Sequence, residues 1–396
     1  MSIVVLLFVT ALTIIFPILS IPINVLGMLL SSGRIRKCYG LLCAFSLAMI
    51  ACIWIPDSTM DLYRHHAQLG LLGGYNFHQL GNLIKTNLEP LQYLVKFFVA
   101  QSGNQNLLQF LVVFIGYSEL FWLICDYCQE KNARRSVFLL ASLFAFSAVR
   151  FIDFASGLWC NLAIINIALG LYLNYFKKIK WPQYVFYMIA ACLHTGTIYV
   201  VLLAVLLSKL RIFRRMKVSV FLLLFVILLS FGGIVLLANN LLGAETTIVK
   251  MLNSMYDSYF TGGEQFVELH TGWSLVFAIA NIISALILSV WYYKKCGRKD
   301  SYSSFVAYMS ICILATIINA GVFVRYGFLL AILIVPILVD LLSMARNRQI
   351  KVVLVTAITT LVLLQLSRSF VQINSAGLTN QIRENIANNT FYLLSE

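Results

Sequence analysis

Apolar runs of roughly 17–25 residues recur along this chain, and this feature constrains its fold more than any other. Such a run forms a helix long enough to cross the hydrocarbon core of a bilayer, which is about 30 Å thick. Hydrophobic residues make up 61% of the 396 residues and charged residues 11%. Soluble domains hold about 45–50% apolar and about 25% charged residues. We therefore predict an all-α, polytopic integral membrane protein.

Short hydrophilic breaks between the apolar runs hold most of the basic residues. These clusters are Arg34, Arg36 and Lys37; Lys131, Arg134 and Arg135; Lys177, Lys178 and Lys180; Lys209, Arg211, Arg214, Arg215 and Lys217; Lys294, Lys295, Arg298 and Lys299; and Arg346, Arg348 and Lys351. Short loops rich in Lys and Arg face the cytoplasm. The net charge of +14 is therefore a topology signal, and we expect membrane lipid but no nucleic acid as a partner.

The order of apolar runs and basic breaks predicts one transmembrane domain, residues 1–396, with about 12 transmembrane helices and both ends outside. Two long outer-face loops, about 56–106 and 239–272, and an outer-face tail, about 367–396, complete the arrangement. The expected spans are about 2–30, 38–55, 107–125, 136–149, 158–176, 218–238, 273–293, 302–320, 322–342 and 352–366, plus two half-length helices between residues 180 and 209. A short helix, about 91–101, is expected to be interfacial or re-entrant because it is too short to span.

The first outer loop carries the densest polar chemistry in the chain. Asp61, Tyr63 and Arg64 lie within four positions of one another, and Glu89 precedes a proline. Asp61 is a candidate to deprotonate a hydroxyl, with Tyr63 stacking on a sugar. The alternative is that Asp61 and Arg64 form an i,i+3 ion pair on a helix. Glu89 likewise has two interpretations, as an acid–base residue or as a helix cap.

Arginines at the outer ends of the expected spans suggest an anionic ligand. Arg64 follows the second span, Arg150 ends the fourth and Arg325 begins the eleventh. The topology places all three at one depth, where their guanidinium groups would suit a polyanion such as a diphosphate. The alternatives are that each arginine reaches lipid headgroups, or that Asp153 orients Arg150.

His194 lies where the two half-length helices meet. We predict that it acts as a general base or hydrogen-bonds a sugar or phosphate. The alternative is a packing role. The sequence contains no Asp-x-Asp pair, P-loop or glycine-rich dinucleotide motif. The adjacent His65 and His66 would point in different directions on a helix. We therefore expect neither a metal ion nor another cofactor.

The order of these motifs resembles the Wzy-type polysaccharide polymerases, in the branch grouped with the EpsG family. The resemblance is carried by the Asp61-Leu-Tyr63-Arg64 motif, by Glu89-Pro-Leu followed by Tyr93, by Arg150, by His194-Thr195 and by Arg325-Tyr326. It covers nearly the whole chain. Asp153 departs from the usual pattern, in which the segment after the arginine is more apolar or begins with Gln.

The resemblance implies a membrane glycosyltransferase that polymerises undecaprenyl-diphosphate-linked oligosaccharide repeat units into O-antigen, capsule or exopolysaccharide. The growing chain would pass to an acceptor sugar hydroxyl on the outer face of a bacterial inner membrane. Arg64, Arg150, Arg325, Tyr63 and Tyr326 would bind substrate, and Asp61, His194 or Glu89 would be catalytic. A chain-length regulator and a flippase of the same pathway are candidate partners.

Three other functions fit parts of the pattern. Another polyprenyl-linked glycosyltransferase, such as an O-antigen ligase, would use the same arginines, but the acidic second outer loop does not favour lipid A binding. A transporter or flippase of lipid-linked oligosaccharide would show internal repeats and arginines through the membrane interior, and neither is present. An acyltransferase built around His194 is the third.

Overall fold

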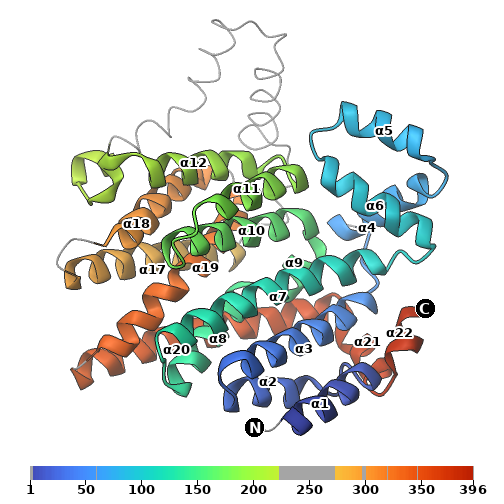
Figure 1. The fold of residues 1–396 in the computed structure, drawn as a ribbon, viewed down its shortest axis with the longest axis horizontal. Coiled ribbons are helices and arrows are strands. Elements are labelled where there is room, and N and C mark those ends of the chain that lie inside the picture. Colours follow the sequence, from blue (N-terminus) through green and yellow to red (C-terminus); the bar gives the residue numbers. More distant parts are fainter. Residues whose placement is uncertain are drawn as a thin grey trace, which may run out of the picture. The chain divides into compact units, whose positions relative to one another are not determined.

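The computed structural model describes residues 3–58, 60–222, 273–296, 300–318, 320–345 and 347–395. Within these ranges all regular secondary structure is helical (Figure 1), which confirms the all-α prediction. The second predicted outer loop, 239–272, and most of the expected span 218–238 lie outside the described residues.

The helices follow one another closely along the described chain. They are α1 (Ile3–Ile15), α2 (Ile21–Leu30), α3 (Gly33–Cys52), α4 (Asp61–Leu72), α5 (Phe77–Thr86), α6 (Pro90–Ser102), α7 (Leu107–Glu130), α8 (Arg135–Ala148), α9 (Phe151–Ser156), α10 (Leu158–Tyr175), α11 (Trp181–Leu193), α12 (Thr197–Lys209), the 3-10 helix η1 (Arg211–Arg214), α17 (Trp273–Lys295), α18 (Ser301–Leu314), the 3-10 helix η2 (Ala315–Ile318), α19 (Ala320–Met344), α20 (Arg348–Ser375), α21 (Leu378–Asn385) and α22 (Thr390–Ser395).

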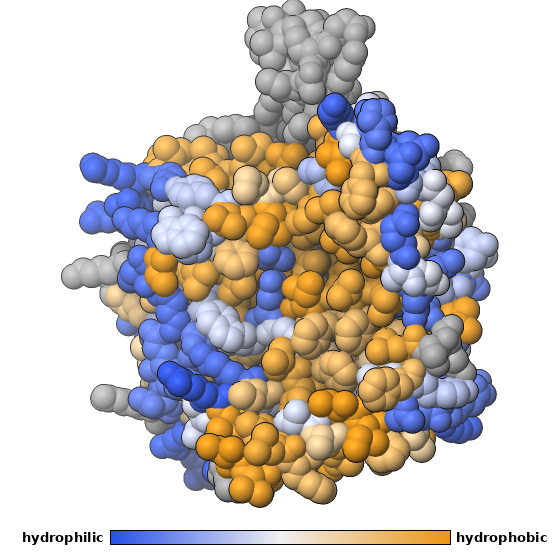
Figure 2. Space-filling view, turned by 45° about the vertical axis from the view of Figure 1, so that its right-hand side comes forward, coloured by the Kyte–Doolittle hydropathy of each residue, from blue (hydrophilic) through white to orange (hydrophobic). Residues whose placement is uncertain are grey.

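Among the described residues, six helices are long and apolar enough to cross a membrane: α3, α7, α10, α17, α19 and α20. Five shorter apolar helices accompany them, namely α1, α2, α8, α12 and α18. Apolar side chains cover much of the molecular face in Figure 2. Large apolar side chains on α1 and α20, such as Phe8 and Val353, are more than two-thirds exposed. The chain is a multi-pass membrane protein, and the count of about 12 crossings stays a prediction.

The first apolar run forms two helices, where the sequence predicted one span kinked or shortened by its prolines. Helix α1 ends at Ile15 and α2 begins at Ile21. Pro17 lies in the break and Pro22 lies in the first turn of α2. Proline lacks an N–H and clashes with the preceding turn, so it ends one helix and is tolerated at the start of another.

The segment predicted as the first outer loop, about 56–106, is mostly helical. It forms α4, α5 and α6, and both α4 and α5 pack on α6. Helix α5 begins with a capping box in which Asn76 and Gln79 exchange side-chain-to-backbone hydrogen bonds. Leu62 and Leu69 are buried inward-facing residues of α4. These polar helices still bury an apolar stripe, which explains why the segment folds rather than remaining an open loop.

The chain forms two compact units, Met1–Thr197 with Leu338–Glu396, and Ile198–Ile337. In the first unit α3 lies along α7, α10 packs on α7 and α11, and α20 packs on α8 (Figure 1). The C-terminal α22 also packs on α3. In the second unit α18 packs on α17 and on η1. All of the polar contacts between helices that are described next lie in the first unit.

Candidate functional site

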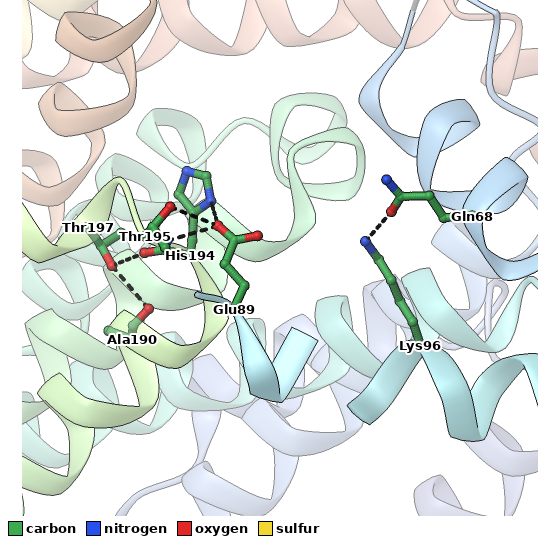
Figure 3. Close-up of polar contacts among 7 residues, drawn as sticks. All are labelled: Gln68, Glu89, Lys96, Ala190, His194, Thr195 and Thr197. Atoms are coloured by element: carbon green, nitrogen blue, oxygen red, sulfur yellow. Dashed lines mark hydrogen bonds and ion pairs between the residues drawn. The ribbon is translucent and has the colours of Figure 1, made fainter. Parts of the chain in front are cut away.

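Two residues that the sequence analysis singled out separately meet in the structure. Glu89 is the N-cap of α6, where Pro90 opens the helix, and His194 follows the last residue of α11. The α11 helix ends here because His194 has an extended backbone. The Thr197 hydroxyl lies 3.0 Å from the carbonyl oxygen of Ala190 and 2.7 Å from that of His194. It thus provides a hydrogen-bond donor for carbonyl groups at the end of the helix. Figure 3 shows the resulting cluster.

The Glu89 carboxylate accepts hydrogen bonds from three groups around the turn after α11. Its Oε1 lies 3.1 Å from His194 Nδ1, 2.9 Å from the Thr195 backbone nitrogen and 3.2 Å from the Thr195 hydroxyl. Burial opposes ionisation of Glu89, but the hydrogen bonds from His194 and Thr195 outweigh it and hold the pKa of this carboxyl below its usual range. Glu89 is therefore an anion at neutral pH.

The Glu89–His194 pair has the arrangement of an oriented general base. A carboxylate that accepts the Nδ1 proton fixes the tautomer and the ring, which assigns acid–base chemistry to Nε2. Both side chains retain about one-fifth of their exposure, so they are shielded without being sealed off. Burial opposes protonation of His194, but Cys160 at the start of α10 and Glu89 outweigh it and raise the pKa of the imidazole to about 9. Three segments of the first unit thus hold His194 in place.

The Asp61 motif forms the local ion pair that was one of its two interpretations. Arg64 contacts the Asp61 carboxylate one turn earlier on α4. Asp61 is the first residue of that helix, where the helix dipole stabilises a negative charge. Tyr63 is about half exposed, which leaves its ring accessible to a ligand. A catalytic or substrate-binding role for these three residues stays a prediction.

Arg150 is buried and pairs with the Asp153 carboxylate one turn later on α9. Gln372 of α20 donates to the same carboxylate at 3.1 Å, and Asn161 of α10 donates to the Asp153 carbonyl at 2.7 Å. Asp153 therefore orients Arg150, as the alternative interpretation held. It also joins three helices in this part of the first unit.

Arg325 and Tyr326 lie near the start of α19, in the second unit. Tyr326 is buried and its ring stacks near that of Tyr199, with 6.0 Å between centroids. A buried ring is less suited to stacking on a sugar than the exposed Tyr63. The expectation that Arg325, Arg150 and Arg64 face one cavity stays a prediction.

Lys96 is the most notable polar residue that the sequence analysis did not assign to the site. Its side chain is completely buried on α6, and its Nζ donates to Gln68 Oε1 of α4 at 2.5 Å (Figure 3). The available signal was a lysine within a short, otherwise apolar segment, two turns after Glu89 on the same helix face. Because His66 Nε2 contacts Gln109 Oε1 of α7 at 2.8 Å, α4 is also tied to a membrane-spanning helix.

A metal site is not evident in the part of the chain that the structure describes. No group of three or more His, Cys, Asp or Glu side chains there is arranged to hold a metal ion. Metal independence stays a prediction.

The described structure defines a multi-pass, all-helical membrane protein in which a shielded carboxylate–imidazole pair lies between α6 and α11. A model of the EpsG family matches residues 61–382, and the chain belongs to that family. The match includes the Asp61 motif, Glu89, Arg150, His194 and Arg325. Family membership identifies a polysaccharide-polymerase-like protein of glycosyltransferase type, for which lipid-linked oligosaccharides are the general substrate class. No curated protein and no solved structure matches the chain.

Proposed function

We propose that this protein polymerises undecaprenyl-diphosphate-linked oligosaccharide repeat units on the periplasmic or outer face of a bacterial inner membrane. The product would be O-antigen, capsule or exopolysaccharide. The Glu89–His194 contact is the observation that supports this proposal best, because glycosyl transfer to a hydroxyl needs a base. Membership of the EpsG family supports the substrate class.

In the proposed reaction the acceptor sugar hydroxyl attacks the anomeric carbon of the donor glycan. The new bond is the C–O glycosidic bond, and the bond that breaks joins the anomeric carbon to the diphosphate oxygen. The hydroxyl proton passes to Nε2 of His194 in its neutral form, whose ring is held by Glu89. Glu89 stabilises the imidazolium that forms, in the way that a carboxylate supports histidine in hydrolase triads. Asp61 remains the rival base.

The leaving diphosphate carries negative charge, which the protein must stabilise as the bond breaks. We assign this task to Arg150 and Arg325, with Arg64 and Tyr63 toward the exposed side of α4. Arg150 is held by Asp153 in the described structure. Because its guanidinium is already oriented, little conformational entropy is lost when the substrate binds. Diphosphate is a good leaving group, so the proposed reaction uses no metal.

The test is reconstitution of the purified protein with lipid-linked repeat units, with products resolved on a glycan ladder gel. We expect the wild type to produce a ladder, and Arg150→Ala, Arg325→Ala and His194→Ala to reduce its formation at least 100-fold while the protein stays folded. The exposed Lys85→Ala variant on α5 serves as the matched control.

Two outcomes would redirect the assignment. Retained activity in His194→Ala, combined with loss in Asp61→Asn, would make Asp61 the base. If the wild type forms no ladder but moves lipid-linked units across a vesicle bilayer, the polymerase proposal fails and a transporter replaces it.

A further inference from the structure

Lys96 is a buried cation without a direct ion-pair partner, and the more distant Glu89 carboxylate favours its charged form. The side chain is fully buried, and among the described residues no carboxylate oxygen lies within 4.0 Å of its ammonium group. Its printed hydrogen bond goes to the neutral amide oxygen of Gln68. A buried ammonium has three protons to donate, and leaving a buried charge without a counter-ion is strongly unfavourable.

Two aromatic rings near this ammonium, and a third packed on one of them, include buried polar atoms without a partner. The Trp159 ring lies 5.7 Å from Lys96 Nζ, and its buried indole N–H finds no acceptor within the described structure. The His65 ring packs edge-on against Trp159 at 6.3 Å, and its buried Nδ1 is also without a partner among the described residues. The Tyr93 ring lies 5.5 Å from Nζ on another side. Buried polar atoms are nearly always paired, so this concentration requires an explanation.

The protonation states give the cluster a single positive charge, which Lys96 carries. Burial, together with the nearby positive charge of Lys96, lowers the pKa of His65 to about 3, so this ring is neutral at physiological pH. Burial lowers the pKa of Lys96 itself to about 8, which still leaves most of it charged near pH 7. The cluster thus combines one cation with an indole donor, and its neutral imidazole adds no second positive charge.

We propose that Lys96, with the indole N–H of Trp159, binds a phosphate oxygen of the diphosphate on a lipid-linked substrate. This inference rests on the proposed function, which supplies the substrate class. Gln68 is half-buried, and its side chain covers the ammonium from the α4 side. In the proposed complex the Gln68 side chain rotates away, and a phosphate oxygen takes the position of its amide oxygen.

The position of the cluster relative to the proposed base is consistent with this role. Glu89 and Lys96 are two turns apart on α6, which is about 11 Å along the helix axis. Their side chains project toward the same side in Figure 3. That spacing suits a substrate whose sugar lies near Glu89 and His194 while its diphosphate lies near Lys96. Lys96 would then be a substrate-binding residue in addition to the arginines.

The test measures binding directly, so that it does not depend on polymerisation. The probes are undecaprenyl diphosphate without a sugar and undecaprenol, which lacks the phosphates, each titrated into purified protein in nanodiscs. We expect the wild type to prefer the diphosphate lipid, and Lys96→Met to weaken its binding at least tenfold while undecaprenol binding is unchanged. Lys85→Met, at an exposed lysine of the neighbouring α5, is the matched control and should bind as the wild type does.

Thermal stability separates a binding role from a packing role. Methionine fills nearly the same volume as lysine, and replacing an uncompensated buried charge with an apolar group is neutral or stabilising. We therefore expect Lys96→Met to melt at or above the temperature of the wild type. If it melts lower, Lys96→Arg decides: recovered diphosphate binding supports the role of the charge, and unrecovered binding overturns it.

The remaining outcomes are also decisive. Diphosphate binding by Lys96→Met within twofold of the wild type overturns the inference, and so does equal affinity of the wild type for the two lipids. A wild type that binds the diphosphate through Lys96 but never forms a ladder upholds this inference while the polymerase proposal fails. If Lys96→Met leaves both the ladder and diphosphate binding unchanged, this inference fails while the polymerase proposal stands.

Discussion

At the residue scale, Glu89 and His194 show that the type of a residue and its apolar setting can identify a candidate site. Each is an ionisable side chain in an otherwise apolar setting, and that scarcity alone made both of them candidates. The sequence left open whether Glu89 is a cap or an acid–base residue. In the structure it occupies the N-cap position of α6 without a side-chain cap hydrogen bond and turns its carboxylate to His194 and Thr195 instead.

Glu89→Gln should separate orientation from charge. The amide preserves the size of the side chain and one acceptor oxygen, but it removes the negative charge that stabilises an imidazolium at His194. We expect the initial polymerisation rate to fall about 100-fold or more. Thr195→Val, which removes only the hydroxyl contact at 3.2 Å, should lower the rate less than about tenfold. Equal rates for Glu89→Gln and the wild type would remove Glu89 from the mechanism.

Lys96 should make stability depend on pH above neutrality. Its folded-state pKa of about 8 lies below the value of about 10.4 for an unfolded lysine. The burial penalty, about 3 kcal/mol, is fully present below pH 8 and is relieved as the pH rises toward 10.4. We expect the melting temperature of the wild type to rise relative to that of Lys96→Met between pH 7.5 and 10.

His194, which contacts Glu89, titrates inside that window with a pKa of about 9, but it is present in both proteins and cancels from the comparison. The groups nearer to Lys96 titrate outside it. Hydrogen bonds hold the pKa of Glu89 low, His65 is neutral above a pKa of about 3, and burial raises the pKa of Tyr93. A constant difference in melting temperature across the window would show that Lys96 is not held as a buried ammonium.

Helix boundaries were predictable at the element scale wherever a local signal marks them. The Glu89-Pro90 start predicted the helix now seen as α6, and the junction at His194 predicted the two short helices α11 and α12. The helices α4 and α5 were not predicted, because their apolar stripes are short and interrupted by polar residues. Their stability depends on packing against α6.

Substitution of Gly116 in α7 tests the close contact between α7 and α9. A Cβ added at this glycine would lie 2.2 Å from the tip of the Phe154 ring. That ring is itself fully buried and cannot move away freely. We expect Gly116→Ala to lower the melting temperature by several degrees, consistent with about 1–3 kcal/mol of overpacking.

The matched control is Gly81→Ala on α5, where a Cβ would meet nothing within 4 Å. Alanine there should leave stability unchanged or slightly higher, because it favours a helix more than glycine does. A Gly116→Ala variant as stable as this control would mean that α7 and α9 are less tightly packed than described.

Topology is the prediction that belongs to the whole molecule. Cys38 is exposed and follows the first basic cluster, which should face the cytoplasm. In a variant whose other cysteines are replaced, an impermeant maleimide should therefore label it in inverted vesicles and not in right-side-out vesicles, with Cys38→Ala abolishing the signal. A cysteine placed at Gly81 on α5 should show the opposite pattern. Labelling of Cys38 from outside would invert the proposed orientation of the site.

The sequence by itself determined the class of this protein. The apolar runs, the prolines that end helices and the basic breaks act locally along the chain, so they specify an all-helical membrane protein wherever their neighbours lie. The ordered motifs were also enough to predict the EpsG family, which the family match confirms. They did not specify contacts between distant segments.

Only the tertiary structure decided which polar residues meet. Glu89 and His194 are 105 positions apart, and their contact exists because α6 packs on α11. Lys96 is surrounded by residues of α4 and α10, so its burial cannot be read from the sequence of α6. The physical reason is that packing between helices depends on the shapes of whole helix faces. A local pattern shows which face is apolar but not which partner covers it.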